Sequence, residues 1–104
     1  MRIAAYQFAV TGDMVENFEK IKNAILLAKK NAVQLLVFPE CALTGYPPRD
    51  IKSSSEVRFD LVEDCCKKLQ KLSDKTGIAL LVGTILAKRG DGRFRMRFSL
   101  MGSE

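Results

Sequence analysis

The sequence predicts an α/β fold with the element order β-α-β-α-β-β. Three short apolar runs are separated by two longer segments with helical spacing, and a last segment alternates strictly between apolar and polar residues. Strands that are separated by helices join through right-handed crossovers, so we expect a largely parallel sheet with an antiparallel final strand. The predicted strands are Ile3–Val10, Val33–Phe38, Ile78–Val82, which Gly83 to Ala87 can extend, and Phe94–Leu100.

The first two predicted strands are nearly continuous apolar runs, which is typical of strands buried on both faces of a sheet. Thr11, Gly12 and Asp13 end the first run. Pro39 ends the second, because proline has no N–H to donate to a neighbouring strand.

Each predicted helix begins with a capping-box pattern, in which a short polar residue precedes a glutamate by three positions. In the first helix these residues are Asp13 and Glu16, and Asn31 can end the helix. In the second they are Ser53 and Glu56, and Gly77 is the natural stop. The apolar stripes are Val15, Phe18, Ile21, Ala24, Ile25 and Ala28 in the first helix, and Phe59, Val62, Cys65, Cys66, Leu69 and Leu72 in the second.

Composition excludes several kinds of site. The 104 residues form one small domain at most, and 17 Lys plus Arg against 12 Asp plus Glu give a formal charge of +5. The absence of histidine excludes Ser-His-Asp and Cys-His catalysis and imidazole zinc sites, and we expect no metal and no cofactor. Three cysteines without a C-x-x-C spacing indicate a reducing environment. No apolar stretch has the length of a membrane span, so we expect a cytoplasmic location and no membrane partner.

Glu40 is the first candidate for chemistry, because it directly follows the apolar run that ends at Pro39. In open α/β sheets, ligands bind beyond the carboxyl ends of the strands. The apolar approach strand is expected to shield the carboxylate partly from water and to bring it into the range of a general base. The alternative is an ordinary solvated glutamate at the end of a strand.

Residues 33–48, VQLLVFPECALTGYPP, resemble the N-terminal signature of the nitrilase superfamily of carbon–nitrogen hydrolases. The resemblance runs along the whole chain in order, from Gln7 in the first strand, through Asn17 and Lys20 in the first helix, to Leu81–Gly83 in the third strand. The loop TGYPPRD, residues 44–50, is also similar to the glutaminase domain of glutamine-dependent NAD synthetases, which belongs to the same superfamily.

The resemblance implies an αββα sandwich with a Glu-Lys-Cys triad that hydrolyses a small amide or nitrile through a thioester. Carried over by motif, Glu40 is the general base, and the lysine and cysteine follow later in the family's chain, beyond Glu104. The resemblance therefore implies that residues 1–104 are the N-terminal, truncated segment of a hydrolase domain that is inactive alone and forms homo-oligomers. Tyr46, in the loop after Glu40, is expected to form a rigid wall that binds substrate, with simple packing of this loop as the alternative.

The cysteines are expected to pack and not to react. Cys41 neighbours Glu40, but adjacent side chains of extended backbone point to opposite faces, so the two groups are not expected to share a proton. Cys65 and Cys66 fall on or beside the apolar stripe of the second helix.

A non-catalytic interaction or nucleic-acid-binding module is the second hypothesis. Lys88, Arg89, Arg93, Arg95 and Arg97 surround or lie on the last predicted strand, and Gly90–Gly92 form its turn. Alternation places the arginines of this strand on one face, where they could follow phosphates. The aromatic residues of the strand alternate to the other face and give no stacking surface beside the arginines, so nucleic acid is not the expected partner.

Overall fold

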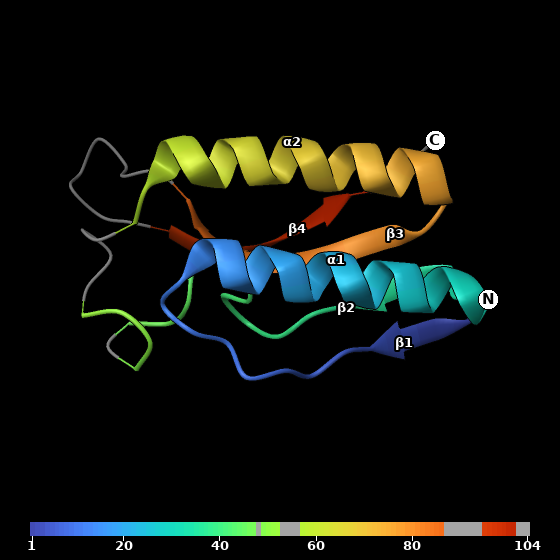
Figure 1. Ribbon diagram of the computed structural model, residues 1–104, viewed down its shortest axis with the longest axis horizontal. Helices are drawn as coiled ribbons and strands as arrows, with labels where there is room; N and C mark the ends of the chain where they lie inside the picture. Colours follow the sequence, from blue (N-terminus) through green and yellow to red (C-terminus); the bar gives the residue numbers. More distant parts are fainter. Residues whose placement is uncertain (48, 53–56, 87–94, 102–104) are drawn as a thin grey trace.

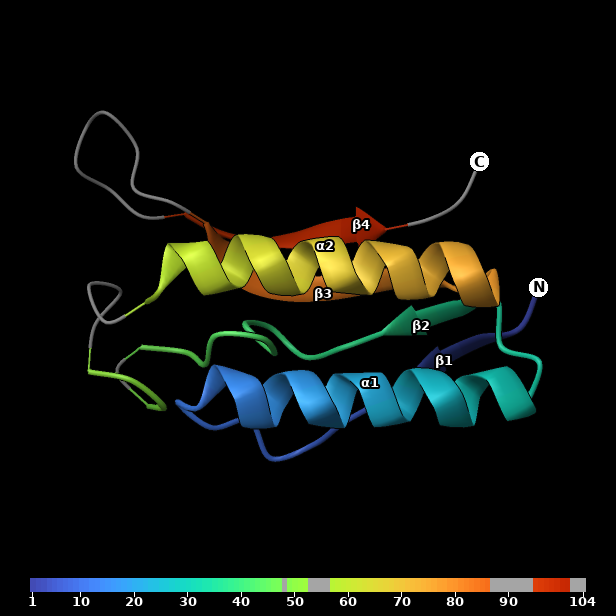
Figure 2. The ribbon, with the colours of Figure 1, turned by 45° about the horizontal axis from the view of Figure 1, so that its top comes forward.

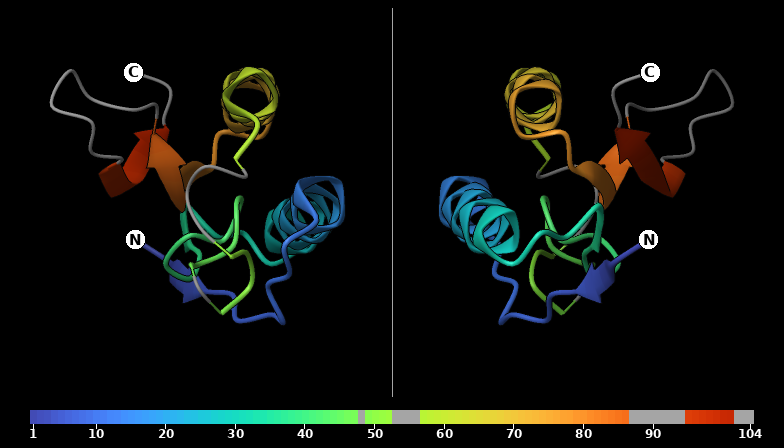
Figure 3. Two further views of the ribbon diagram at one scale, coloured as in Figure 1. Left: turned by 90° about the vertical axis from the view of Figure 1, so that its left-hand side faces the viewer. Right: turned by 90° about the vertical axis from the view of Figure 1, so that its right-hand side faces the viewer.

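The computed structural model describes residues 1–47, 49–52, 57–86 and 95–101, and for residues 86, 95–99 and 101 it describes the backbone. One four-stranded sheet has the order β1-β2-β3-β4, and two helices lie on one of its faces (Figures 1 and 3). The elements are β1 (Ile3–Ala5), α1 (Met14–Lys30), β2 (Leu35–Val37), α2 (Phe59–Thr76), β3 (Ala79–Leu86) and β4 (Arg95–Met101). The predicted α/β class and element order are therefore confirmed.

The pairing of the strands also follows the prediction. β1 pairs parallel with β2, with Ile3 opposite Leu35, and β2 pairs parallel with β3. β4 pairs antiparallel with β3. The turn residues Gly90–Gly92 lie outside the described residues.

The first strand is shorter than predicted. Regular pairing ends at Ala5, although the Tyr6 N–H still donates to the carbonyl of Val37 over 2.9 Å. The prediction that this strand is buried on both faces is wrong, since the side chain of Ile3 is 59% exposed. β1 is an edge strand of the described sheet. Ala4 pairs with the core residue Leu36, so alternation places Ile3 on the other face, which neither helix covers.

The first helix has the predicted boundaries. The Asp13 carboxylate accepts hydrogen bonds from the N–H groups of Val15 and Glu16, and Asn31 is the C-cap. Glu16 forms an ion pair with Lys20 over 3.2 Å. Val15 was predicted to belong to the buried stripe of this helix, but its side chain is 65% exposed.

The second helix begins later than predicted. Phe59 is its first residue, and the N-cap Arg58 makes no side-chain capping bond. The predicted capping residues Ser53 and Glu56 lie outside the described residues. Gly77 ends the helix in the left-handed conformation, with φ of 76°, as a glycine C-cap commonly does.

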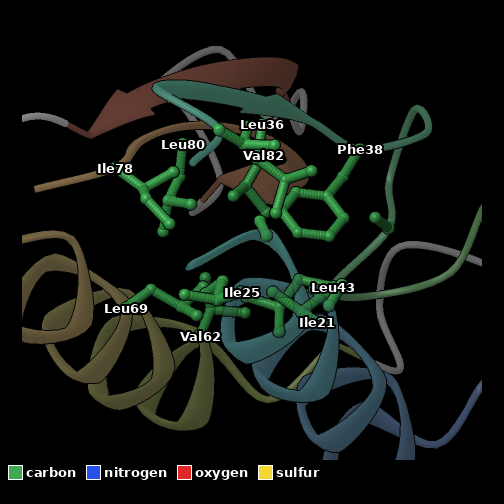
Figure 4. Close-up of a cluster of buried hydrophobic side chains, with 14 residues drawn as sticks. Ile21, Ile25, Leu36, Phe38, Leu43, Val62, Leu69, Ile78, Leu80 and Val82 are labelled. Atoms are coloured by element: carbon green, nitrogen blue, oxygen red, sulfur yellow. The ribbon is translucent and has the colours of Figure 1, made fainter. Parts of the chain in front are cut away.

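The core lies between the sheet and the helix layer (Figure 4). Leu36, Leu80 and Val82 project from the strands toward Ile25 and Leu69 of the helices, and all five are at most 2% exposed. Because strand side chains alternate, their sequence neighbours lie on the other side of the sheet. Among the described residues, neither helix has the length and apolarity needed to cross a membrane.

Candidate active site

Glu40 lies just beyond the carboxyl end of β2, in a turn that leads away from the sheet. The Ala42 N–H donates to the Pro39 carbonyl over 3.1 Å, and the Leu43 N–H donates to the Gly83 carbonyl of β3 over 3.2 Å. A Cβ on Gly83 would lie 2.5 Å from the Cys41 nitrogen, closer than any side chain tolerates. A glycine at this position in β3 therefore lets the Glu40 turn pack directly against the strand.

Glu40 and Tyr46 line the same cavity, which has a volume of about 540 Å³. Its walls come from the segment after β1 and from the loop after β2, so it lies where the sequence predicts a ligand site. Glu40 is exposed, and the expectation that the approach strand shields it is wrong for the described residues. The reason is that the turn carries Glu40 out of the sheet. The cavity is lined by Gln7, Phe8, Ala9, Val10, Pro39, Glu40, Tyr46, Arg49 and Asp50.

A charged pair beside Tyr46, Arg49 and Asp50, also lines this cavity, and no sequence motif pointed to this pair. The Arg49 guanidinium donates to the Asp50 carboxylate over 2.9 Å and lies 5.8 Å from the centre of the Tyr46 ring. The Tyr46 N–H donates to the same carboxylate over 2.8 Å. Hydrogen bonds from Arg49, and the one from the Tyr46 backbone, lower the pKa of Asp50 although burial opposes them. Asp50 therefore holds the Tyr46 backbone and Arg49 together at the cavity.

Side chains of helix α1 hold both walls of the cavity, the segment after β1 and the loop after β2, through hydrogen bonds. Asn17 is fully buried, and its side-chain amide donates to the carbonyls of Thr11 and Leu43 over 2.7 and 3.0 Å. Its amide oxygen accepts from the Thr11 N–H over 2.9 Å. Lys20 donates to the Ala9 carbonyl over 3.0 Å. The segment after β1 and the loop after β2 are thus tied to one helix.

Cys41 packs as predicted, but for a different physical reason. Its backbone is not extended, since φ is 51°, and its side chain is only 1% exposed. Burial, together with the nearby Glu40 charge, raises the pKa of the thiol from 9.0 to about 11. Cys41 is therefore protonated at neutral pH, which makes it a poor nucleophile.

Cys65 and Cys66 pack against the core from α2, as predicted. All three cysteines are free thiols. Burial raises the pKa of Cys65 and of Cys66 as well. None of the three cysteines lines the cavity.

The basic residues of the second hypothesis are only partly described. Lys88, Arg89 and Arg93 lie outside the described residues. The backbone of β4 pairs Arg95 with Leu86 and Arg97 with Thr84.

The cavity offers one candidate general base, Glu40, and hydrogen-bonding groups on Gln7, Tyr46, Arg49 and Asp50. Within the part of the chain that the structure describes, no group of three His, Cys, Asp or Glu side chains is arranged to hold a metal ion. What this arrangement can supply is proton transfer and the orientation of a polar ligand.

Comparisons with known proteins agree on one family. The family model for carbon-nitrogen hydrolases matches residues 2–101. The glutamine-dependent NAD(+) synthetase of Synechocystis sp. is 42% identical over 76 residues, which are 71% of this chain and 13% of that enzyme. The enzyme of the same name from Thermotoga maritima is 35% identical over 89 residues, 82% of this chain and 15% of that enzyme.

Solved structures of an amidase from Nesterenkonia sp. have the same fold. One of them superposes with a TM-score of 0.77 at 27% sequence identity and covers 96% of this chain and 37% of the amidase. A variant of this amidase, described as a member of the nitrilase superfamily, gives 0.79 at 26% identity and covers 98% of this chain and 38% of the amidase. The chain therefore spans less than two fifths of the amidase and about a seventh of the NAD(+) synthetases.

Proposed function

Because the chain belongs to the carbon-nitrogen hydrolase family, we propose that it is the N-terminal segment of a nitrilase-type hydrolase with Glu40 as general base. The enzyme would cleave a non-peptide carbon–nitrogen bond of a small amide or nitrile. The observation that carries this proposal is the place of Glu40, after β2 and on the wall of the 540 Å³ cavity. The expected cytoplasmic location and homo-oligomeric state belong to the same proposal.

In the proposed reaction, a cysteine thiolate attacks the amide carbon, and the carbon–nitrogen bond breaks to leave a thioester and an amine. Glu40 takes the thiol proton, delivers it to the departing nitrogen, and then activates the water that hydrolyses the thioester. A lysine stabilises the oxyanion. The lysine and the cysteine come from chain beyond this segment. An active-site cysteine is named for the Nesterenkonia amidase, in line with this scheme.

The exposure of Glu40 fits a cavity that is incomplete in this segment. A general base works best when its pKa lies near the operating pH, and partial burial is one way to raise the pKa of a carboxylic acid. Further chain packed over the cavity would exclude water from Glu40. Tyr46 would then form the substrate-binding wall, with its backbone held by Asp50 and the Arg49 guanidinium over its ring.

Glutamine is the first substrate to test. The two curated relatives are glutamine-dependent enzymes, and their identities of 42% and 35% exceed the 27% of the amidase. Glutamine also carries the primary amide that the proposed reaction requires. The second hypothesis, a basic binding module, has no support from the described residues and stays a prediction.

The experiment places this chain in an active enzyme. In a chimera, this chain replaces the segment of the Synechocystis NAD(+) synthetase to which it is similar, and the hydrolysis of glutamine by the chimera is measured. We expect the chimera to hydrolyse glutamine and Glu40→Gln to lower kcat by about 10² to 10⁴. Glu63→Gln, on the exposed face of α2, is the matched control and should leave kcat unchanged. A folded Glu40→Gln chimera with normal turnover would refute the assignment of Glu40.

The 104-residue chain alone should release no ammonia from glutamine.

A further inference from the structure

A groove between α1 and α2, on the outer side of the helix layer, is lined by lysines and belongs to no part of the proposed active site. The two helices lie side by side and run in the same direction (Figure 2). The groove has a volume of about 400 Å³. Phe18 and Glu19 of α1 and Leu72 of α2 line it together with four lysines.

The floor of the groove is apolar, and its rim is basic. Phe18 and Leu72 are half-buried side chains that pack against the core and still face the groove. Lys22 extends from α1, and Lys68, Lys71 and Lys75 extend from α2. Four positive charges thus face one negative charge, that of Glu19.

Most of this positive charge is not neutralised by the protein. Lys68 pairs with Asp64 over 3.0 Å and lies 6.0 Å from the centre of the Phe18 ring. Among the ion pairs of the described residues, none contains Lys22, Lys71 or Lys75. These three ammonium groups are available to an anionic partner.

The spacing of the lysines on α2 fits a helix as partner. Lys68, Lys71 and Lys75 are three and four residues apart, so they form one row about 10 Å long on α2. Acidic residues with the same spacing on a second helix would meet this row. A groove between two parallel helices also accepts the apolar ridge of a third helix.

We propose that the groove between α1 and α2 binds an acidic amphipathic helix of a partner protein. The apolar face of that helix packs on Phe18 and Leu72, and its carboxylates pair with Lys22, Lys71 and Lys75. The groove is lined by residues of α1 and α2, and both helices lie on one face of the sheet, opposite the face that they leave uncovered. The groove shares no lining residue with the candidate active site, so we expect binding there to leave catalysis unchanged.

The test uses the 104-residue chain and a synthetic helical peptide of about 18 residues, with leucines on one face and glutamates on the flanks. Fluorescence anisotropy of the labelled peptide should show saturable binding of one peptide per chain. The double variant Lys71→Gln with Lys75→Gln should weaken binding about tenfold at low salt, because it removes two exposed ion pairs. Added salt should reduce the difference between this variant and the wild type.

The matched control is Lys30→Gln with Lys67→Gln. It removes the same total charge, one lysine from each of the two helices that line the groove, and neither Lys30 nor Lys67 lines the groove. Lys30 also matches Lys75 in position, since each stands in the last turn of its helix. Binding by this control should stay within about twofold of the wild type. Equal loss in both double variants would overturn the proposal, as would equal binding of a scrambled acidic peptide that has no apolar face. Tighter binding of anionic phospholipid vesicles than of the peptide, lost in the groove variant alone, would assign the groove to a membrane surface and also overturn it.

Discussion

Tyr46 lines the candidate active site, and its backbone N–H donates to the Asp50 carboxylate over 2.8 Å. We expect Tyr46→Phe to raise KM for glutamine about fivefold and to leave kcat within about twofold, since a lost hydrogen bond costs roughly 1 kcal/mol. Steady-state kinetics of the chimera measure both constants. Tyr6→Phe is the control, because the Tyr6 ring contacts the rings of Phe8 and Phe38 and Tyr6 does not line the cavity. A fall in kcat at constant KM would instead give the Tyr46 hydroxyl a role in the chemical step.

The Cys41 thiol makes stability depend on pH at the alkaline end. In the folded chain its pKa is about 11, raised by burial and by Glu40, whereas the reference value is 9.0. The unfolded chain therefore loses this proton first, and the stabilisation by the neutral buried thiol is present below pH 9 and falls as the pH rises toward 11. Denaturant unfolding of the wild type and of Cys41→Ala at several pH values measures the effect. The free energy of unfolding should fall more steeply for the wild type; parallel curves would contradict the raised pKa.

Single residues explain what the sequence could and could not predict about the site. The position of Glu40 at the cavity was predictable because Glu40 follows an apolar strand, and ligands bind beyond the ends of such strands in α/β sheets. Its role as general base stays a prediction. Arg49 and Asp50 were not predictable, because their neighbourhood is created by the folding of a loop around Tyr46. Cys41 was assigned to packing through an assumption of extended backbone, and its positive φ has no clear signal in the sequence.

At the scale of elements, the predictions hold where local physics decides the structure. α1 has an aspartate cap and Gly77 ends α2 with positive φ, and both boundaries were predicted. The start of α2 was predicted too early, since Val57 and Arg58 are not helical and the helix begins at Phe59. Its N-cap, Arg58, makes no side-chain capping bond, so the sequence carries no capping signal at the true start. The short β1 was missed for another reason: the length of a strand depends on its neighbours, and β2 is itself only three residues long.

Asn17 is the point at which α1 holds the two loops of the candidate active site. Asn17→Ala would leave the Thr11 N–H and the carbonyls of Thr11 and Leu43 without their partner inside the protein. We expect the free energy of unfolding to fall by about 2 to 4 kcal/mol, since each unsatisfied buried group costs about 1 to 3 kcal/mol and partial access of water offsets part of this. Chemical denaturation of the 104-residue chain measures the change.

Asn23→Ala is the matched control for this prediction, because Asn23 is an exposed asparagine of the same helix. Its effect should lie within about 0.5 kcal/mol of zero. Amide hydrogen exchange gives a second readout: Asn17→Ala should speed exchange at Thr11 more than in the core strand β3. Uniform acceleration at both places would mean that Asn17 supports global stability without a specific hold on the loops.

At the scale of the whole molecule, the described structure has a covered and an uncovered side. Both helices lie on one face of the sheet (Figure 3). Strand alternation and the pairing register place mainly apolar residues on the second face. Ile3 is 59% exposed and Leu100 is 70% exposed on this face. Parallel sheets are normally covered on both faces, so the described structure corresponds to one helix layer and one sheet of a layered sandwich. The residues of this open face are Ile3, Ala5, Leu35, Val37, Ala79, Leu81 and Leu100.

The open face predicts that the 104-residue chain associates with itself when nothing else covers the sheet. Burial of apolar surface from water contributes about 25 cal/mol per Å², so even a modest contact area favours association. Sedimentation velocity should show an average mass above 11.6 kDa that rises with concentration. Ile3→Thr with Leu100→Thr keeps strand-forming residues and should shift the chain to a monomer. The control is Val15→Gln with Leu26→Gln, two side chains of α1 that are 65% and 48% exposed on the helix layer. If this control alone produced the monomer, the contact would lie on the helices, and the open face would need no cover.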